Sequence, residues 1–139
     1  MDDTAFRLRK AEALRSFSLL ESCVHLKELG QAAVVPVGHQ FWSTIATRAD
    51  LAPGRLLGTL RWEQDMATWE MHPAGDELLV ALSGRFEILM QDGKSDRVVE
   101  LAGGQAFLVP FGVWHRYKVQ TPGEVLFVTP GKGTQYRAL

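Results

Sequence analysis

Two carboxylates and two histidines are placed where short extended segments can bring them to one site. Glu70, His72 and Glu77 lie within "WEMHPAGDE", and His115 follows in "PFGVWH". Because side chains alternate along a strand, Glu70 and His72 project to the same side. We expect "PAGD" to turn the chain, so that Glu77 leads the second strand of a hairpin and reaches the same space. Histidine nitrogens and carboxylate oxygens suit Mn, Fe, Ni or Zn, so the pattern indicates a divalent metal site.

The connection before His115 is predicted to hold that histidine at the start of a strand. Pro110 and Gly112 precede it in "VPFGVWH". Proline fixes its own φ and glycine permits a tight turn, so this connection has a defined shape. His115 is then a fourth candidate ligand, supplied by a different part of the chain.

The elements that must position these side chains are short strands. The segments are separated by connections that mostly contain Gly, Pro or Asp, which favours an antiparallel sandwich or barrel. Eight candidate strands follow one another: "LLGTLRWE", "MATWEMH", "DELLVAL", "RFEILMQ", "DRVVEL", "QAFLVP", "WHRYKV" and "EVLFVT".

The first part of the chain is predicted to mix short helices and strands. Apolar residues at helical spacing predict a helix over residues 4–22. "CVHLKEL" and "QAAVVPV" predict two strands, and "HQFWSTIATRAD" has a helical apolar face that ends at the Pro53–Gly54 turn. The Gly-rich tail "PGKGTQYRAL" is expected to be a surface strap or a loose end.

The two polar stretches resemble the paired motifs of the cupin superfamily, which are written G-x5-H-x-H-x3-4-E-x6-G and G-x5-P-x-G-x2-H-x3-N. The matching residues are His72, Glu77 and Gly84 in the first motif and Gly104, Pro110, Gly112 and His115 in the second. The resemblance covers residues 56–130. It implies an all-β fold, a double-stranded β-helix (jelly-roll) barrel, here with one or two short N-terminal helices. We expect one domain over residues 1–139, with a helical extension over residues 1–22.

Family members hold one divalent ion with three histidines and one glutamate, and the resemblance carries that role to His72, Glu77 and His115. Glu70 stands where the family usually has its first histidine. It is a substitute ligand, or a general base beside a three-ligand ion, or a sign of a metal-poor site, since the family contains members that have lost the ion. A carboxylate as the fourth ligand, in place of a histidine, would add a negative charge to the site and favour harder ions.

Two further positions depart from the family pattern. The leading glycine, which would fall at Asp65 or Gln64, is absent, and Val119 occupies the place where the family often has asparagine. Tyr117 shares the strand face of His115, two positions on, and is predicted to line a substrate pocket.

Composition limits the partners of the chain. Fifteen basic and sixteen acidic residues nearly cancel, so the basic surface of a nucleic-acid-binding protein is not expected. The longest apolar runs are too short to cross a membrane. One cysteine, Cys23, and an N-terminus without an export signal favour a reducing cytoplasm. The resemblance implies a homodimer.

Three functions remain open at this point. The first is a cupin that acts on a small molecule through its metal ion, for which the family offers dioxygenation, isomerisation and decarboxylation. The second is a module that binds a sugar or a small acid without turnover. The third is a scaffold in which the polar cluster is a relic, because one fold hosts many activities.

Overall fold

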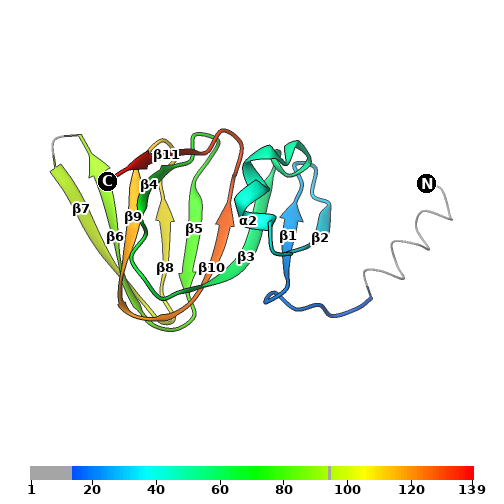
Figure 1. Ribbon diagram of the computed structural model, residues 1–139, viewed down its shortest axis with the longest axis horizontal. Helices are drawn as coiled ribbons and strands as arrows, with labels where there is room; N and C mark the ends of the chain where they lie inside the picture. The colour runs from blue at the N-terminus through cyan, green and yellow to red at the C-terminus, as the bar shows by residue number, and fades with distance from the viewer. Residues whose placement is uncertain (1–13, 94) are drawn as a thin grey trace.

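The computed structural model describes residues 14–93 and 95–139, which form two antiparallel β-sheets (Figure 1). The larger sheet has the order β2 (Ala32–Pro36), β1 (Ser22–Leu26), β3 (Arg55–Trp62), β10 (Gly123–Thr129), β5 (Glu77–Ala81) and β8 (Ala106–Val109). The smaller sheet has the order β11 (Gln135–Ala138), β4 (Thr68–Met71), β9 (His115–Thr121), β6 (Arg85–Asp92) and β7 (Ser95–Ala102).

The chain changes sheet at nearly every connection from β3 onward. Strands β3, β5, β8 and β10 belong to the larger sheet, and β4, β6, β7, β9 and β11 belong to the smaller one. Only β6 and β7 follow each other within one sheet in this part of the chain. This alternation is the jelly-roll topology, and the prediction of an all-β jelly-roll is confirmed.

The core lies between the sheets because both present alternating apolar side chains inward. Strand β6 buries every second residue, with Phe86 and Ile88 almost fully excluded from solvent. Val109, Val125 and Leu101 are buried to the same degree on other strands. Burial of this apolar surface is the main force that holds the two sheets together.

A short helical segment connects β2 to β3. It consists of α2 (Phe41–Thr44) and two 3-10 turns, η1 (Ile45–Thr47) and η2 (Ala49–Leu51). Phe41 and Leu51 are buried, and Trp42 packs edge-on against Phe127 of β10 with ring centroids 5.6 Å apart. The segment is therefore fixed against the larger sheet, beside the strands that Figure 1 labels β3 and β10.

Most predicted elements are present, and two differ. All eight predicted strands of the second half of the chain are observed, as are the two strands and the helical turns before them. The predicted hairpin over residues 69–81 is wrong, because β4 and β5 lie in different sheets and "PAGD" crosses between them. The tail is not loose, since β11 pairs with β4.

The predicted N-terminal helix lies mostly outside the described residues. Residues 14–21 form turns and irregular structure, and β1 begins at Ser22.

Candidate functional site

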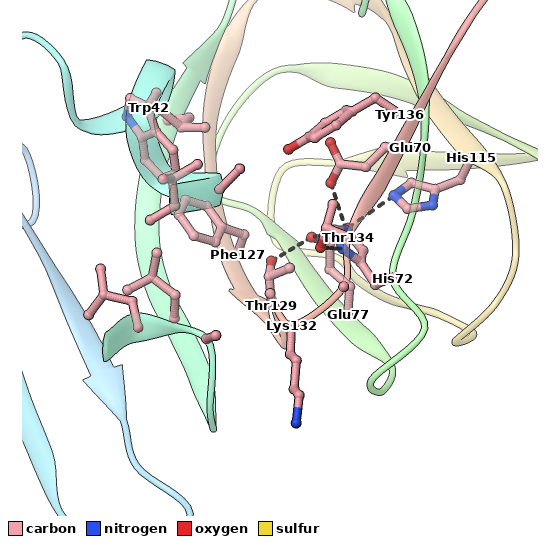
Figure 2. Close-up of a pocket in the computed structure, with 18 of the residues that line it drawn as sticks. Trp42, Glu70, His72, Glu77, His115, Phe127, Thr129, Lys132, Thr134 and Tyr136 are labelled. Carbon is pink, nitrogen blue, oxygen red and sulfur yellow. Dashed lines mark hydrogen bonds and ion pairs between the residues drawn. The ribbon is translucent and has the colours of Figure 1, made fainter. Parts of the chain in front are cut away.

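Four side chains from both sheets converge on one point at the end of the sandwich (Figure 2). Glu70 comes from β4, His72 follows that strand, and Glu77 and His115 are the first residues of β5 and β9. Each offers one nitrogen or oxygen atom, and these atoms all lie within 4.8 Å of one another. The site thus joins residues of the smaller sheet to Glu77 of the larger sheet.

Strand register explains why these side chains point inward. Glu70 is paired with His115 across β4 and β9, which places the two residues side by side. Glu77 is in phase with Leu79 and Ala81, the buried residues of β5, so its carboxylate faces the interior. Burial of a carboxylate costs free energy unless a cation or hydrogen-bond donors lie beside it. The two histidines of the cluster lie beside the carboxylate of Glu77.

The connection before β9 is tied to the connection that carries His72. The backbone N–H of Gly112 donates to the carbonyl oxygen of His72 at 2.9 Å. The N–H of Phe111 donates to Oδ1 of Asp76 at 2.9 Å. Gly112 has φ of +75°, a conformation that glycine adopts without strain. These bonds hold His115 at a fixed distance from His72.

Hydrogen bonds at the far side of each imidazole fix its orientation. Nδ1 of His115 lies 3.1 Å from the carbonyl oxygen of Val113, which only accepts, so this nitrogen is the donor. Nδ1 of His72 is 2.8 Å from the hydroxyl oxygen of Thr134. The neutral imidazole of His115 therefore turns the lone pair of Nε2 toward the cluster, and that of His72 does the same when its Nδ1 donates to the Thr134 hydroxyl.

The donor atoms face one another across short gaps. Nε2 of His72 lies 2.7 Å from Oε1 of Glu70 and 3.3 Å from Oε2 of Glu77. Nε2 of His115 lies 3.3 Å from Oε1 of Glu77. Nevertheless Nε2 of His72 is buried without a hydrogen-bond partner of acceptable geometry among the described residues. An orphaned buried nitrogen beside two carboxylates fits a divalent cation, so the residues present suit the metal that the sequence indicates.

The ionisation of the cluster is strongly perturbed when only protons are bound. Burial by itself would lower the pKa of His72, but the carboxylates of Glu70 and Glu77 outweigh it and raise the pKa to about 9. Burial would raise the pKa of Glu77, but His115 and His72 lower it to about 2. Glu77 also accepts a hydrogen bond of 2.5 Å from the hydroxyl of Thr129. A cationic centre is therefore favoured here.

A family model described as "Cupin domain" matches residues 58–130, more than half of the chain. The chain belongs to the cupin family. The matched range contains all four residues of the cluster, and it ends at the beginning of the tail that leads to β11.

Solved structures resemble this cupin over part of its length. An oxalate oxidase in complex with the substrate analogue glycolate has a TM-score of 0.50 and 12% identity, over 58% of this chain and 45% of the other. A cupin-2 domain protein from Shewanella frigidimarina has a TM-score of 0.48 and 20% identity, over 55% and 70%. A hydroquinone 1,2-dioxygenase from Sphingomonas sp. TTNP3 with 4-hydroxybenzoate bound has 0.48 and 19%, over 54% and 58%. At these identities the likeness describes the fold alone.

The search of curated proteins found no match. Within residues 14–93 and 95–139 there is no helix with the length and apolar character needed to cross a membrane.

The cluster lies in the wall of a pocket of about 690 Å³. Tyr117, the predicted pocket residue, is half-buried and lines it, with its ring stacked on Trp62 at a centroid distance of 3.7 Å. Tyr136 of β11 lines it too and lies beside Glu70 in Figure 2. Burial raises the pKa of the Tyr117 phenol, and the charges of Glu70 and Asp65 raise it further, so it remains a protonated hydroxyl donor at neutral pH.

Several residues that line the site were not predicted from the sequence. Thr134, Tyr136 and Lys132 belong to the tail, and Thr129 ends β10. The only signal in the tail was the alternation of Thr134 and Tyr136 in "TQYRA", both of types common in strands. Neither hydroxyl belongs to a cupin motif, so the resemblance did not point to them.

The two other departures from the family pattern meet in space. The backbone N–H of Val119 donates to Oδ1 of Asp65 at 2.8 Å. The bond links the connection before β4 to the middle of β9, the two strands that carry Glu70 and His115. Asp65, one of the two positions at which the family glycine would fall, is thus bonded to the residue in place of the family asparagine.

Cys23 and His25 lie on β1, outside the site. Cys23 is buried, and burial raises the pKa of its thiol to about 11, so it stays protonated and unreactive. His25 is buried, with Nε2 2.5 Å from the carbonyl oxygen of Pro53. Both are packing residues.

Proposed function

We propose that this cupin holds one divalent transition-metal ion and uses it to act on a small molecule in the adjacent pocket. The ligands are Glu70, His72, Glu77 and His115. The observation that carries the proposal is the convergence of four donor atoms within 4.8 Å, with Nε2 of His72 buried beside two carboxylates and without a hydrogen bond of acceptable geometry among the described residues.

The residues of this site have different roles. When bound, the ion would supply Lewis-acid catalysis, which polarises a carbonyl or hydroxyl oxygen of the substrate. The two glutamates balance the charge of a divalent ion, and Thr129 holds the carboxylate of Glu77 in place. Glu70 is less buried than the other three and faces the pocket, which suits a ligand next to the substrate. Isomerisation and dioxygenation are the reactions that we expect for such a centre.

Elemental analysis of protein purified without chelators and without a nickel column tests the proposal. We expect about one Mn, Fe, Ni or Zn ion per chain in the wild type, and the same in His39→Ala, whose exposed histidine lies outside the site. Removal of the ion is expected to lower the melting temperature, because a ligand that binds only the folded chain stabilises it. Protein without stoichiometric metal, and with no thermal response to added Mn, Fe, Ni or Zn, contradicts the proposal.

Thr134 is a positioning residue for the metal centre, because its hydroxyl holds Nδ1 of His72. We expect Thr134→Val, which keeps the shape and removes the hydroxyl, to weaken metal binding by about 10- to 100-fold. Thr134→Ser retains the hydroxyl and should restore most of the affinity. Competition with a metal-sensitive dye measures both variants. Equal affinity in Thr134→Val and wild type would show that the tail has no part in the site.

A further inference from the structure

The wall of the pocket opposite the cluster is built by the helical segment before β3. Trp42, Ile45 and Leu51 line the pocket from this segment. The family match begins only at residue 58, so this helical segment lies outside the matched part of the chain. Figure 2 shows Trp42 and Phe127 on the side of the pocket that faces Glu70, Tyr136 and the histidines. The segment therefore defines what the metal centre can receive.

The wall is apolar over most of its surface. Aliphatic and aromatic side chains from the helical segment and from four strands line the pocket: Trp42, Ile45, Leu51, Leu56, Leu60, Trp62, Leu79, Ile88 and Phe127. Burial of apolar ligand surface against these side chains is favourable. A sugar would leave most of its hydroxyls without partners against this wall, which costs free energy. The wall thus favours a ligand with an apolar body.

The cations around the pocket are already engaged or exposed. The guanidinium of Arg48 is paired with Asp50, with Nε 2.9 Å from Oδ1. Arg116 donates to the carbonyl oxygen of Met66 and lies over the ring of Trp69. Lys132 is exposed at the rim, and in Figure 2 its amino group points away from the cluster. None of the lysine and arginine side chains that line the pocket among the described residues is fully buried.

The charge of the centre leads to the same conclusion. Two glutamates already balance a divalent ion, so an acidic ligand would leave a net negative charge in a buried place. Tyr117 and Tyr136 line the same pocket, with Tyr136 beside Glu70 in Figure 2, and a phenol group can donate a hydrogen bond to a ligand oxygen. The polar end of the pocket therefore suits a hydroxyl or carbonyl group.

We propose that the pocket takes an uncharged aromatic molecule, which lays its ring against Trp42 and Phe127 and turns a hydroxyl or carbonyl oxygen toward the metal centre. This inference rests on the proposed function and names its substrate class. A volume of about 690 Å³ lies within the range of small-molecule sites and accommodates one or two fused rings.

Calorimetric titration of the metal-loaded protein tests the inference with three probes. 2-Naphthol is uncharged at neutral pH, 2-naphthoate has the same rings with a charge, and glucose is uncharged without an apolar body. We expect 2-naphthol to bind at least about 10-fold more tightly than either of the others. Tighter binding of 2-naphthoate or glucose to protein that holds its metal overturns the inference and leaves the proposed function intact.

Variants of the wall separate the pocket from the metal. Trp42→Ala is expected to weaken 2-naphthol binding at least about 10-fold while the metal content stays at one ion per chain. Ala46→Glu puts a charge on the same wall at an exposed position, and should have the same effect without loss of folding. Phe17→Ala, an exposed aromatic away from the pocket, is the matched control.

The outcomes of these variants are distinct. Unchanged 2-naphthol binding in folded Trp42→Ala and Ala46→Glu overturns the inference. Loss of metal in the wild type overturns the proposed function instead, and elemental analysis of each sample separates the two failures.

Discussion

Glu77→Gln is expected to abolish metal binding while the fold survives. The carboxylate of Glu77 lies 3.3 Å from Nε2 of both histidines, so it is the group that both imidazoles share. Glutamine keeps the volume and a hydrogen bond from Thr129, but removes the charge. Partners outside the ligand shell contribute about 10- to 100-fold to metal affinity, and a buried ligand contributes more. We expect a loss of at least about 1,000-fold, roughly 4 kcal/mol.

The measurement is a metal competition titration with Glu63→Gln as the matched control. Glu63 is exposed and paired with Arg61 on the surface, so its loss of charge should leave metal affinity unchanged. Circular dichroism of Glu77→Gln should show a folded β protein. Retention of the metal with wild-type affinity would mean that the four side chains form a hydrogen-bonded cluster with no ligand role for Glu77.

The strands could be predicted from the sequence because each strand has its own local pattern of apolar and polar residues. Alternation in segments such as "RFEILMQ" and the glycines between them reflect local geometry, and β6 buries the residues that the alternation selects. Sequence reasoning failed on the connection between β4 and β5. Proline and glycine in "PAGD" indicate a change of direction, but a tight hairpin and a crossing between sheets need the same residue types. Only the packing of the two sheets decides between them.

The tail illustrates the second limit of sequence reasoning. All four residues of β11 are exposed, so no buried face generates a pattern that marks a strand. Its place depends on the free edge of β4, a property of the folded sheet. The motif residues were found because a metal site needs particular donors at particular spacings. Thr134 contributes one hydroxyl that many residues of the chain also possess, so its role appears only with its distance to His72.

Gly123→Ala is expected to be the most destabilising single substitution that we describe. β10 begins at Gly123, where the chain passes directly over the turn between β5 and β6. A Cβ atom at this position would lie 2.3 Å from the carbonyl oxygen of Ser83 and 2.6 Å from the backbone nitrogen of Gly84. The turn cannot retreat, because the N–H of Leu82 donates to the carbonyl oxygen of Glu124 at 2.8 Å and Gly84 already adopts φ of +84°.

The clash is with backbone atoms, so rotation of a side chain cannot relieve it. We expect Gly123→Ala to lower the free energy of unfolding by at least about 4 kcal/mol, measured by chemical denaturation of the metal-free chain. Gly131→Ala is the matched control, because a Cβ there meets no atom within 4 Å and its φ is not positive. Equal stability of the two variants would show that the crossing of β10 over the turn is looser than the structure has it. Since β5 runs from Glu77 in the site to Ala81 before this turn, the crossing also fixes the far end of the strand that carries the shared carboxylate.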